Sequence, residues 1–278
     1  MTNSWLTPGR ILLIGLGGLT LFYLLAPSLV VVPMGFSSSS SLQFPPPHFS
    51  LRWYEKMFTD PNWSRGLIAS LEAALLTAAL ATVLGTAAAF SLIRGQFPGK
   101  SVVNAMILSP LIVPAVISAI GMYSVYLTGW RVGGFSLGWS IAGTLPGVVV
   151  AHTVLALPFV VVNVAASLRT IDPNLELAAM SLGARPWQAF RRIVLPLVLP
   201  GVLAGALFAF IISWDEVVVA IFLTSPFFRT LPVEMWQQVF TQVDPTVAAV
   251  STVLLTVTTL LFLFSLLLRR ESRSVQDR

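Results

Sequence analysis

Three acidic residues stand inside long apolar runs of the chain and are the first candidates for chemistry. Glu72 lies in one run, and Asp215 and Glu216 follow Trp214 in another. A carboxylate beside an indole ring suits a cationic amine, through charge pairing and cation–π attraction. Charges at such positions usually face protein or water. These four residues are therefore candidates for lining the path of a solute, and an outer gate or a helix break is the alternative for the Asp-Glu pair.

Other kinds of chemistry find little support in the residue types. The chain has no Cys, which excludes disulfides and thiolate metal sites. His48 and His152 are too few and too far apart for a histidine cluster, and we expect His152 and Asn163 to form interhelical hydrogen bonds. Asp215 and Glu216 are adjacent, so they point in different directions on a helix. No catalytic, cofactor-binding or metal-binding residue is predicted, and an intramembrane enzyme is disfavoured.

The elements that position these residues follow from composition. Of the 278 residues, 56% are hydrophobic and 10% are charged, against about 25% charged residues in soluble domains. A membrane-spanning helix needs roughly 20 apolar residues, and six runs meet that need. They are Ile11 to Val32, Leu67 to Ile93, Val102 to Leu127, Ile141 to Leu168, Leu197 to Leu223 and Val247 to Leu268. Backbone groups in lipid must be satisfied within each segment, so we predict an all-α membrane protein with a single transmembrane domain over residues 1–278.

Charge sets the predicted orientation. Eleven of the sixteen Lys and Arg residues fall on the side that holds both termini and the second and fourth connections. The positive-inside rule therefore places both termini in the cytoplasm. The first run is longer than the roughly 7–15 apolar residues of a signal peptide, so we expect it to be a membrane anchor. The basic residues are scattered between the runs, so no nucleic-acid partner is expected.

Small residues and prolines indicate how the helices pack. The second run is rich in Gly, Ala and Ser, and the fifth carries Gly201 and Gly205 at GxxxG spacing. Such residues let helix backbones approach closely, either within the chain or between subunits. Pro110 and Pro114 should bend the third run.

Two connections outside the runs are expected to contain short helices. Trp53 to Phe58 is a candidate helix at the membrane interface. Leu231, Met235, Trp236 and Val239 form an i, i+4, i+5, i+8 stripe, which predicts a short amphipathic helix.

The connection between the fourth and fifth runs, residues 169–195, has the clearest local pattern. Asp172 followed by a proline is typical of a helix start. Gly183 stands where a left-handed residue would end that helix. A second short helix is then predicted over Trp187 to Val194, with Pro196 marking the start of the fifth run. The predicted unit is helix–Gly–helix, and we call residues 169–195 the elbow segment.

The elbow segment resembles the EAA loop of bacterial ATP-binding-cassette importers, whose pattern is E-A-A, three residues, Gly, nine residues and I-x-L-P. The matching residues are Ala178, Ala179, Gly183, Ile193, Leu195 and Pro196. Leu177 occupies the Glu position, with Glu176 one residue earlier, which leaves open whether Glu176 makes the polar contact. Six spans with the loop at this place resemble the type I importer permease fold. Ser213 to Glu216, Phe222 to Pro226 and Leu231-Pro232 resemble the spermidine/putrescine permease subfamily.

The resemblance implies a permease subunit of the bacterial inner membrane that forms the solute path. It implies a separate cytoplasmic ATPase, which binds ATP and Mg²⁺ and docks on Glu176, Ala178, Ala179, Gly183, Ala184, Ile193, Leu195 and Pro196. It further implies a second, different permease subunit and an extracytoplasmic solute-binding protein. The implied solute is spermidine, putrescine or a related amine. Relatives of that subfamily handle 4-aminobutyrate, opines, aminoethylphosphonate, thiamine or iron, and these solutes are the alternatives.

Two rival interpretations remain at this stage. The elbow segment is alternatively a surface hairpin that only links two spans. The chain is alternatively an ion-coupled secondary transporter, although such proteins often contain internal repeats and no 20–50 residue repeat is visible. The chain lacks a G-x-x-x-x-G-K-S/T phosphate loop, so we do not expect it to hydrolyse ATP itself.

Overall fold

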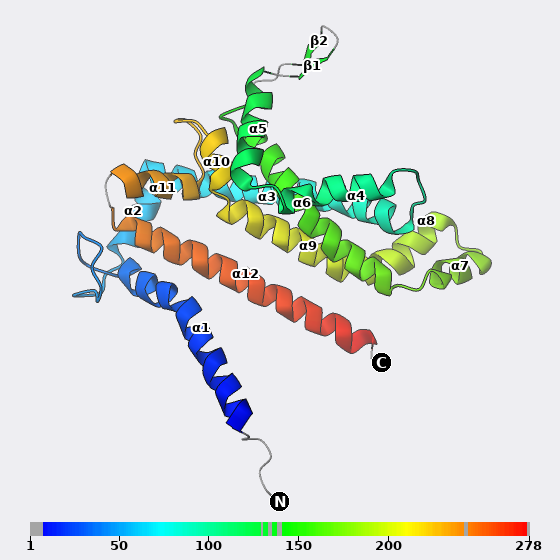
Figure 1. Cartoon of the computed structure of the whole chain (residues 1–278), viewed down its shortest axis with the longest axis horizontal. Helices are drawn as coiled ribbons and strands as arrows, with labels where there is room; N and C mark the ends of the chain where they lie inside the picture. Colours follow the sequence, from blue (N-terminus) through cyan, green and yellow to red (C-terminus); the bar gives the residue numbers. More distant parts are fainter. Residues whose placement is uncertain (1–7, 129, 133–134, 138–140, 242–243, 277–278) are drawn as a thin grey trace, which may run out of the picture. The chain divides into compact units, whose positions relative to one another are not determined.

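The structure, a computed structural model, describes residues 8–128, 130–132, 135–137, 141–241 and 244–276 (Figure 1). The chain divides into two compact units. The first unit contains Met1–Pro61 and Gln237–Leu255, and the second contains Asn62–Trp236 and Thr256–Arg278. Arg278, one of the basic residues on the predicted cytoplasmic side, lies outside the described residues.

Helices dominate the described chain. The long ones are α1 (Pro8–Gly35), α3 (Pro61–Arg94), α6 (Leu145–Thr170), α9 (Leu195–Asp215) and α12 (Thr246–Gln276). The short ones are α2 (Arg52–Thr59), α4 (Lys100–Leu108), α5 (Ala115–Thr128), α7 (Asn174–Ser181), α8 (Pro186–Ala189), α10 (Val218–Leu223) and α11 (Leu231–Thr241). A 3₁₀ turn, Ser109–Leu111, follows α4, and a π-helical segment, Phe190–Val194, follows α8. An antiparallel hairpin of β1 (Trp130–Val132) and β2 (Phe135–Leu137) follows α5.

Five helices of the described chain are long and apolar enough to cross a membrane. The pair Lys100–Leu111 and Ala115–Leu127 also passes that test when taken together, which gives up to six spans. The pair is bent by 107°, so the bend predicted from Pro110 and Pro114 is confirmed. The Ser109 hydroxyl donates a hydrogen bond to the Met106 carbonyl (2.8 Å) at this bend.

The core of the second unit forms where α6 and α9 run antiparallel, side by side (Figure 1). A Cβ added at Gly201 would collide with the Ser167 side chain and lie 2.9 Å from the Asn163 carbonyl oxygen. A Cβ at Gly205 would lie 3.0 Å from the Val160 Cα. The two glycines therefore let α9 approach α6 closely. Of the two roles left open for this GxxxG pair, the structure shows packing within the chain.

Helix α3 turns its small residues inward, as predicted for the second run. Its buried positions include Gly66, Ala69, Ser70, Ala73, Ala74, Ala81, Gly85 and Ala89. The opposite face carries exposed leucines, such as Leu71, Leu75 and Leu76. Such a helix suits a bundle with protein on one side and lipid or another subunit on the other.

The fifth apolar run differs from its predicted form at both ends. The helix predicted over Trp187 to Val194 is present as α8 and the π-helical segment, but it is not separate, because residues Pro186–Asp215 make one continuous helix. The Leu195 N–H bonds to the Phe190 carbonyl, five residues earlier, and this π-type pairing directly precedes Pro196, which has no N–H to donate. At the other end α9 stops at Asp215, and α10 is a separate helix.

Helix α11 exists as predicted, but its buried face is not the predicted stripe. Its buried residues are the first four, Leu231 to Glu234, whereas Trp236 and Val239 are 47% and 45% exposed. The Leu231 N–H donates to the Ser70 hydroxyl (2.8 Å). The start of α11 is therefore held against α3, whereas Trp236 and Val239 of the predicted stripe remain exposed.

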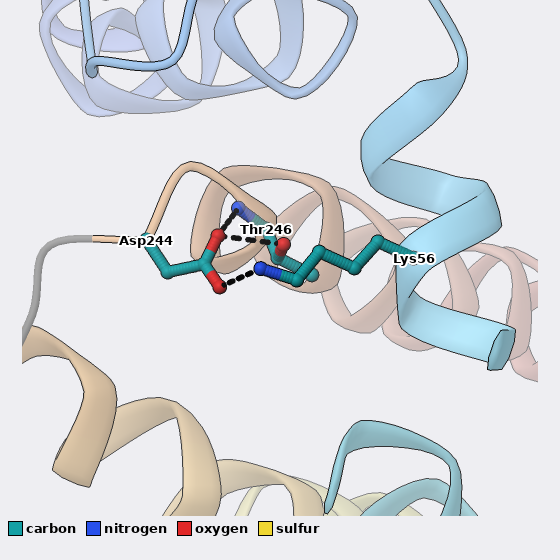
Figure 2. Close-up of polar contacts among 3 residues, drawn as sticks. All are labelled: Lys56, Asp244 and Thr246. Atoms are coloured by element: carbon teal, nitrogen blue, oxygen red, sulfur yellow. Dashed lines mark hydrogen bonds and ion pairs between the residues drawn. The ribbon is translucent and has the colours of Figure 1, made fainter. Parts of the chain in front are cut away.

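The first unit is fastened by a charged cluster between α2 and the start of α12 (Figure 2). The Lys56 ammonium donates to the Asp244 carboxylate (2.7 Å), which also accepts from the N–H and hydroxyl of Thr246 (2.9 and 2.7 Å). Burial favours the neutral acid, but the hydrogen bonds and the charge of Lys56 outweigh it and hold the pKa of Asp244 below its ordinary value. Asp244 thus ties the segment before α12 to α2.

Candidate functional site

The elbow segment folds as its sequence predicts around Gly183. The Asp172 carboxylate accepts from the Asn174 N–H (2.9 Å) at the start of α7. At the end of α7, Gly183 adopts a φ of +90°, and the Ala184 N–H donates to the Ala179 carbonyl (3.0 Å). This backbone reversal is the usual reason for Gly at a helix C-terminus. It returns the chain into α8 at one end of the second unit (Figure 1).

The elbow segment presents apolar side chains outward. Among the described residues, α7 contributes no buried side chain. Leu177 is 55% exposed, Leu182 90% and Trp187 65%, and Ala178 is exposed as well. A group of large apolar side chains that the chain leaves uncovered is typical of a surface that meets another protein.

The Glu176 side chain contacts α3, whereas the neighbouring Leu177 side chain is exposed. Its carboxylate forms an ion pair with the guanidinium of Arg94, the last residue of α3, and both side chains are partly buried. Consecutive residues on a helix face directions about 100° apart, so the acid meets α3 while Leu177 faces outward. Sequence reasoning missed Arg94, because nothing local connects residues 82 positions apart.

The remaining motif residues lie where the elbow segment joins the core. Ile193 is in the π-helical segment and is half-buried. Leu195 packs against a buried cluster of α3, α6 and α9 that includes Val194 and Val198. Pro196 is exposed, at the second position of α9. These residues continue the elbow segment directly into the membrane-spanning part of α9.

The acids at the end of α9 have separate surroundings. Asp215 is exposed and accepts hydrogen bonds from the Thr258 hydroxyl of α12 (3.1 and 3.2 Å). The Glu216 carboxylate accepts from the Val219 N–H (2.8 Å) and so caps α10. This cap, together with the extended backbone of Glu216 (ψ 117°), accounts for the break between α9 and α10. The sequence signal for the break was an acid pair inside an apolar run.

Trp214 does not join its neighbouring acid in a common pocket. The residue is 3% exposed, and its ring stacks on Phe210 with the centroids 5.8 Å apart. In this conformation the indole offers no open face to a solute. Glu72 is exposed on α3. The structure therefore does not bring the four candidate path residues together as one site.

Two polar residues of α6 were expected to form interhelical hydrogen bonds. His152 is fully buried, and its Nδ1 lies 2.8 Å from the Ser213 hydroxyl of α9, so that expectation is confirmed for His152. The Asn163 side-chain amide donates to the Phe159 carbonyl of the same helix (2.8 Å), which is a contact within α6. Ser213 and Thr258 are the polar partners that the sequence analysis did not identify.

Comparisons with known proteins agree on one family for this chain. Residues 81–274 match the family described as "Binding-protein-dependent transport system inner membrane component". The spermidine/putrescine transport system permease protein PotC of Haemophilus influenzae is 33% identical over 225 residues, which cover 81% of this chain and 83% of the relative. The putrescine transport system permease protein PotI of Escherichia coli is 32% identical over 250 residues, 90% of this chain and 86% of the relative.

Solved structures show the same fold at low identity. A chain of a bacterial ABC transporter involved in the import of the polysaccharide alginate superposes with a TM-score of 0.68 at 16% identity, over 95% of this chain and 96% of that one. The alginate transporter in complex with its alginate-bound periplasmic protein gives 0.70 at 15% identity, over 96% and 94%. This chain therefore has the type I importer permease fold and belongs to the binding-protein-dependent transport system inner membrane components, as a permease subunit.

Proposed function

We propose that this permease imports a polyamine, putrescine or spermidine, and is driven by a separate ATPase that grips the elbow segment. The observation that supports the coupling is the exposure of Leu177, Leu182 and Trp187. These side chains give the elbow segment of this family member an uncovered apolar surface. The ATPase would bind ATP and Mg²⁺ and move the elbow segment. The spans would then exchange between two packings, as nucleotide binding favours one of them.

The choice of solute rests on relatives and on charge. The relatives PotC and PotI are named for spermidine and putrescine transport. Asp215 is an exposed carboxylate at the end of a spanning helix, which suits a cationic amine. We assign the solute contact to Asp215, because Glu216 is occupied in capping α10.

The assembly we propose has further subunits. A second, different permease would cover the exposed faces of the spanning helices, and a solute-binding protein would deliver the polyamine from outside the inner membrane. One structural neighbour is an ABC transporter in complex with a periplasmic protein. In this assembly the termini of the chain and the elbow segment face the cytoplasm.

Uptake of labelled putrescine into proteoliposomes that hold the assembled complex tests the proposal. We expect putrescine uptake in the wild type, and a reduction of about tenfold in Asp215→Asn, because one lost charge contact of about 1.4 kcal/mol changes binding by that factor. Glu216→Gln keeps an oxygen that can cap α10 and should retain uptake; Glu55→Gln, an exposed acid of α2, is the control. Import of 4-aminobutyrate or thiamine instead of putrescine would overturn the polyamine assignment.

A further inference from the structure

A continuous set of charged and aromatic side chains links the elbow segment to the end of α3. Arg94 pairs with Glu176 of α7, and its guanidinium carbon lies 5.8 Å from the ring centroid of Phe90, one turn back on α3. The Phe90 ring meets the Phe190 ring edge-to-face, with the centroids 5.4 Å apart. Phe190 in turn stacks on Trp187 of α8 at 5.6 Å. We call these five residues the α3 clamp.

The α3 clamp touches both halves of the elbow segment. Glu176 belongs to the helix before Gly183, and Trp187 and Phe190 come after it. A Cβ at Gly183 would meet no atom within 4 Å, and α7 has no buried residue in the described chain. The hairpin is thus packed loosely at its tip, and the Arg94 ion pair ties α7 to α3.

The second half of the elbow segment is mechanically joined to α9. Helix α8 runs through the π-helical segment into α9 without interruption. Phe190 begins that segment, and Val194 at its end is fully buried in the core cluster. Segments of π-helix occur frequently at functional sites. A movement of α8 is therefore passed to α9 through the helix, and to α3 through the contact between Phe190 and Phe90.

We propose that Arg94 is a positioning residue that clamps the elbow segment to the end of α3, so that the ATPase moves α3 and α9 together. This inference rests on the proposed coupling function. It also accounts for the displaced acid of the motif. Glu176 serves a contact within the chain, and Leu177, at the position of the motif's Glu, is left for the ATPase.

Distance measurement between spin labels tests the clamp, because the chain has no Cys of its own. Ser91 of α3 and Ser181 of α7 are exposed, and each hydroxyl donates to a carbonyl four residues earlier in its own helix. Cysteines at these two positions carry the labels in the complex assembled with cysteine-free partner subunits. The clamp predicts one narrow distance distribution that is the same with and without a non-hydrolysable ATP analogue.

Variants separate the clamp from general packing. Arg94→Gln and Glu176→Gln should broaden the distribution, and should lower putrescine uptake by up to about fivefold, the factor by which a partly exposed ion pair changes an equilibrium. The exchanged pair, Arg94→Glu with Glu176→Arg, should narrow the distribution again and recover uptake. Lys100→Gln is the matched control, since Lys100 donates to the Gly95 carbonyl beside the same helix end.

Two results would overturn the clamp. One is a wild-type distance that shifts when the analogue binds, because α7 then slides on α3. The other is an unbroadened distribution in Arg94→Gln. Co-purification of the ATPase with the wild-type chain is measured in the same preparation: its absence would contradict the proposed function, whereas its presence together with a shifting distance would contradict the clamp alone.

Discussion

The elbow segment and the contact between α6 and α9 both depend on glycine, for opposite reasons. Gly201 and Gly205 lie against α6, and a Cβ at either position would meet atoms at 3.0 Å or closer. Gly183 has no neighbour within 4 Å but has a φ of +90°. The first region needs the missing side chain for space, and the second needs it for backbone conformation. One region is therefore built to remain fixed, and the other to turn sharply while its surface stays open.

The largest effect should follow from filling the close contact. Gly201→Val places atoms against Ser167 and the Asn163 carbonyl, and overpacking of this kind costs about 1–3 kcal/mol or more. We expect a lower midpoint of thermal unfolding, as measured by tryptophan fluorescence in detergent. Gly121→Val, at a helical glycine of α5 with no atom within 4 Å, is the matched control. Equal midpoints for the two variants would show that α6 and α9 do not need this close approach.

Gly183→Val should separate transport from stability. A β-branched residue at this positive φ costs about 1–3 kcal/mol of strain, so the elbow segment should leave its observed conformation. Because no side chain of α7 is buried, the unfolding midpoint should change little, while uptake falls about tenfold or more.

Gly183→Asn is the conservative comparison, because Asn tolerates left-handed backbone better than other residues. It should keep most of the uptake. Normal uptake in the Val variant would defeat the coupling role of the elbow segment and favour a hairpin that only links two spans.

The smallest effect concerns the ion pair between Lys56 and Asp244 in the first unit. Asp244→Asn should lower stability by about 1 kcal/mol, because the partner ammonium is partly exposed and screened. The pKa of Asp244 is depressed in the folded chain, so its contribution is complete above the ordinary carboxyl pKa of about 3.9 and is lost as the pH falls through the lower folded value.

The difference in unfolding midpoint between wild type and Asp244→Asn should therefore be constant from about pH 8 to about pH 5 and should shrink as the pH falls further, through the lowered folded pKa of Asp244. Lys56→Gln should give a similar loss, and the double variant should lose no more than either single one. A difference that does not shrink as the pH falls through the lowered folded pKa of Asp244 would assign the effect to something other than the charge.

Local patterns in the sequence predicted most of the fold. Apolar length identified the spanning helices, and the Gly183 reversal and the bend at Pro110 and Pro114 follow from backbone chemistry at single residues. The break at Glu216 was predicted only as an alternative, because apolar content continues through Val217 to Val219. The continuity of α8 with α9 was missed because Pro196 was interpreted as a boundary, whereas the π-type pairing before it accommodates a proline.

The site was less predictable than the fold. The elbow segment could be placed because its motif is contiguous in the chain. The partners of its acid and of Asp215, namely Arg94 and Thr258, lie 82 and 43 positions away, and the stacking of Trp214 on Phe210 depends on how α9 packs. Such contacts follow from tertiary structure, which no periodicity within one segment encodes.

The hydroxyl of Ser109 at the bend between α4 and α5 has a consequence for where that bend can lie. Pro110 has no N–H to donate to the carbonyl of Met106, four residues earlier, but that oxygen accepts from both the N–H and the hydroxyl of Ser109 (2.8 Å for the hydroxyl). A bare carbonyl facing acyl chains would cost several kcal/mol. Because the adjoining residue supplies donors to this oxygen, the bend does not have to lie next to water on account of that carbonyl.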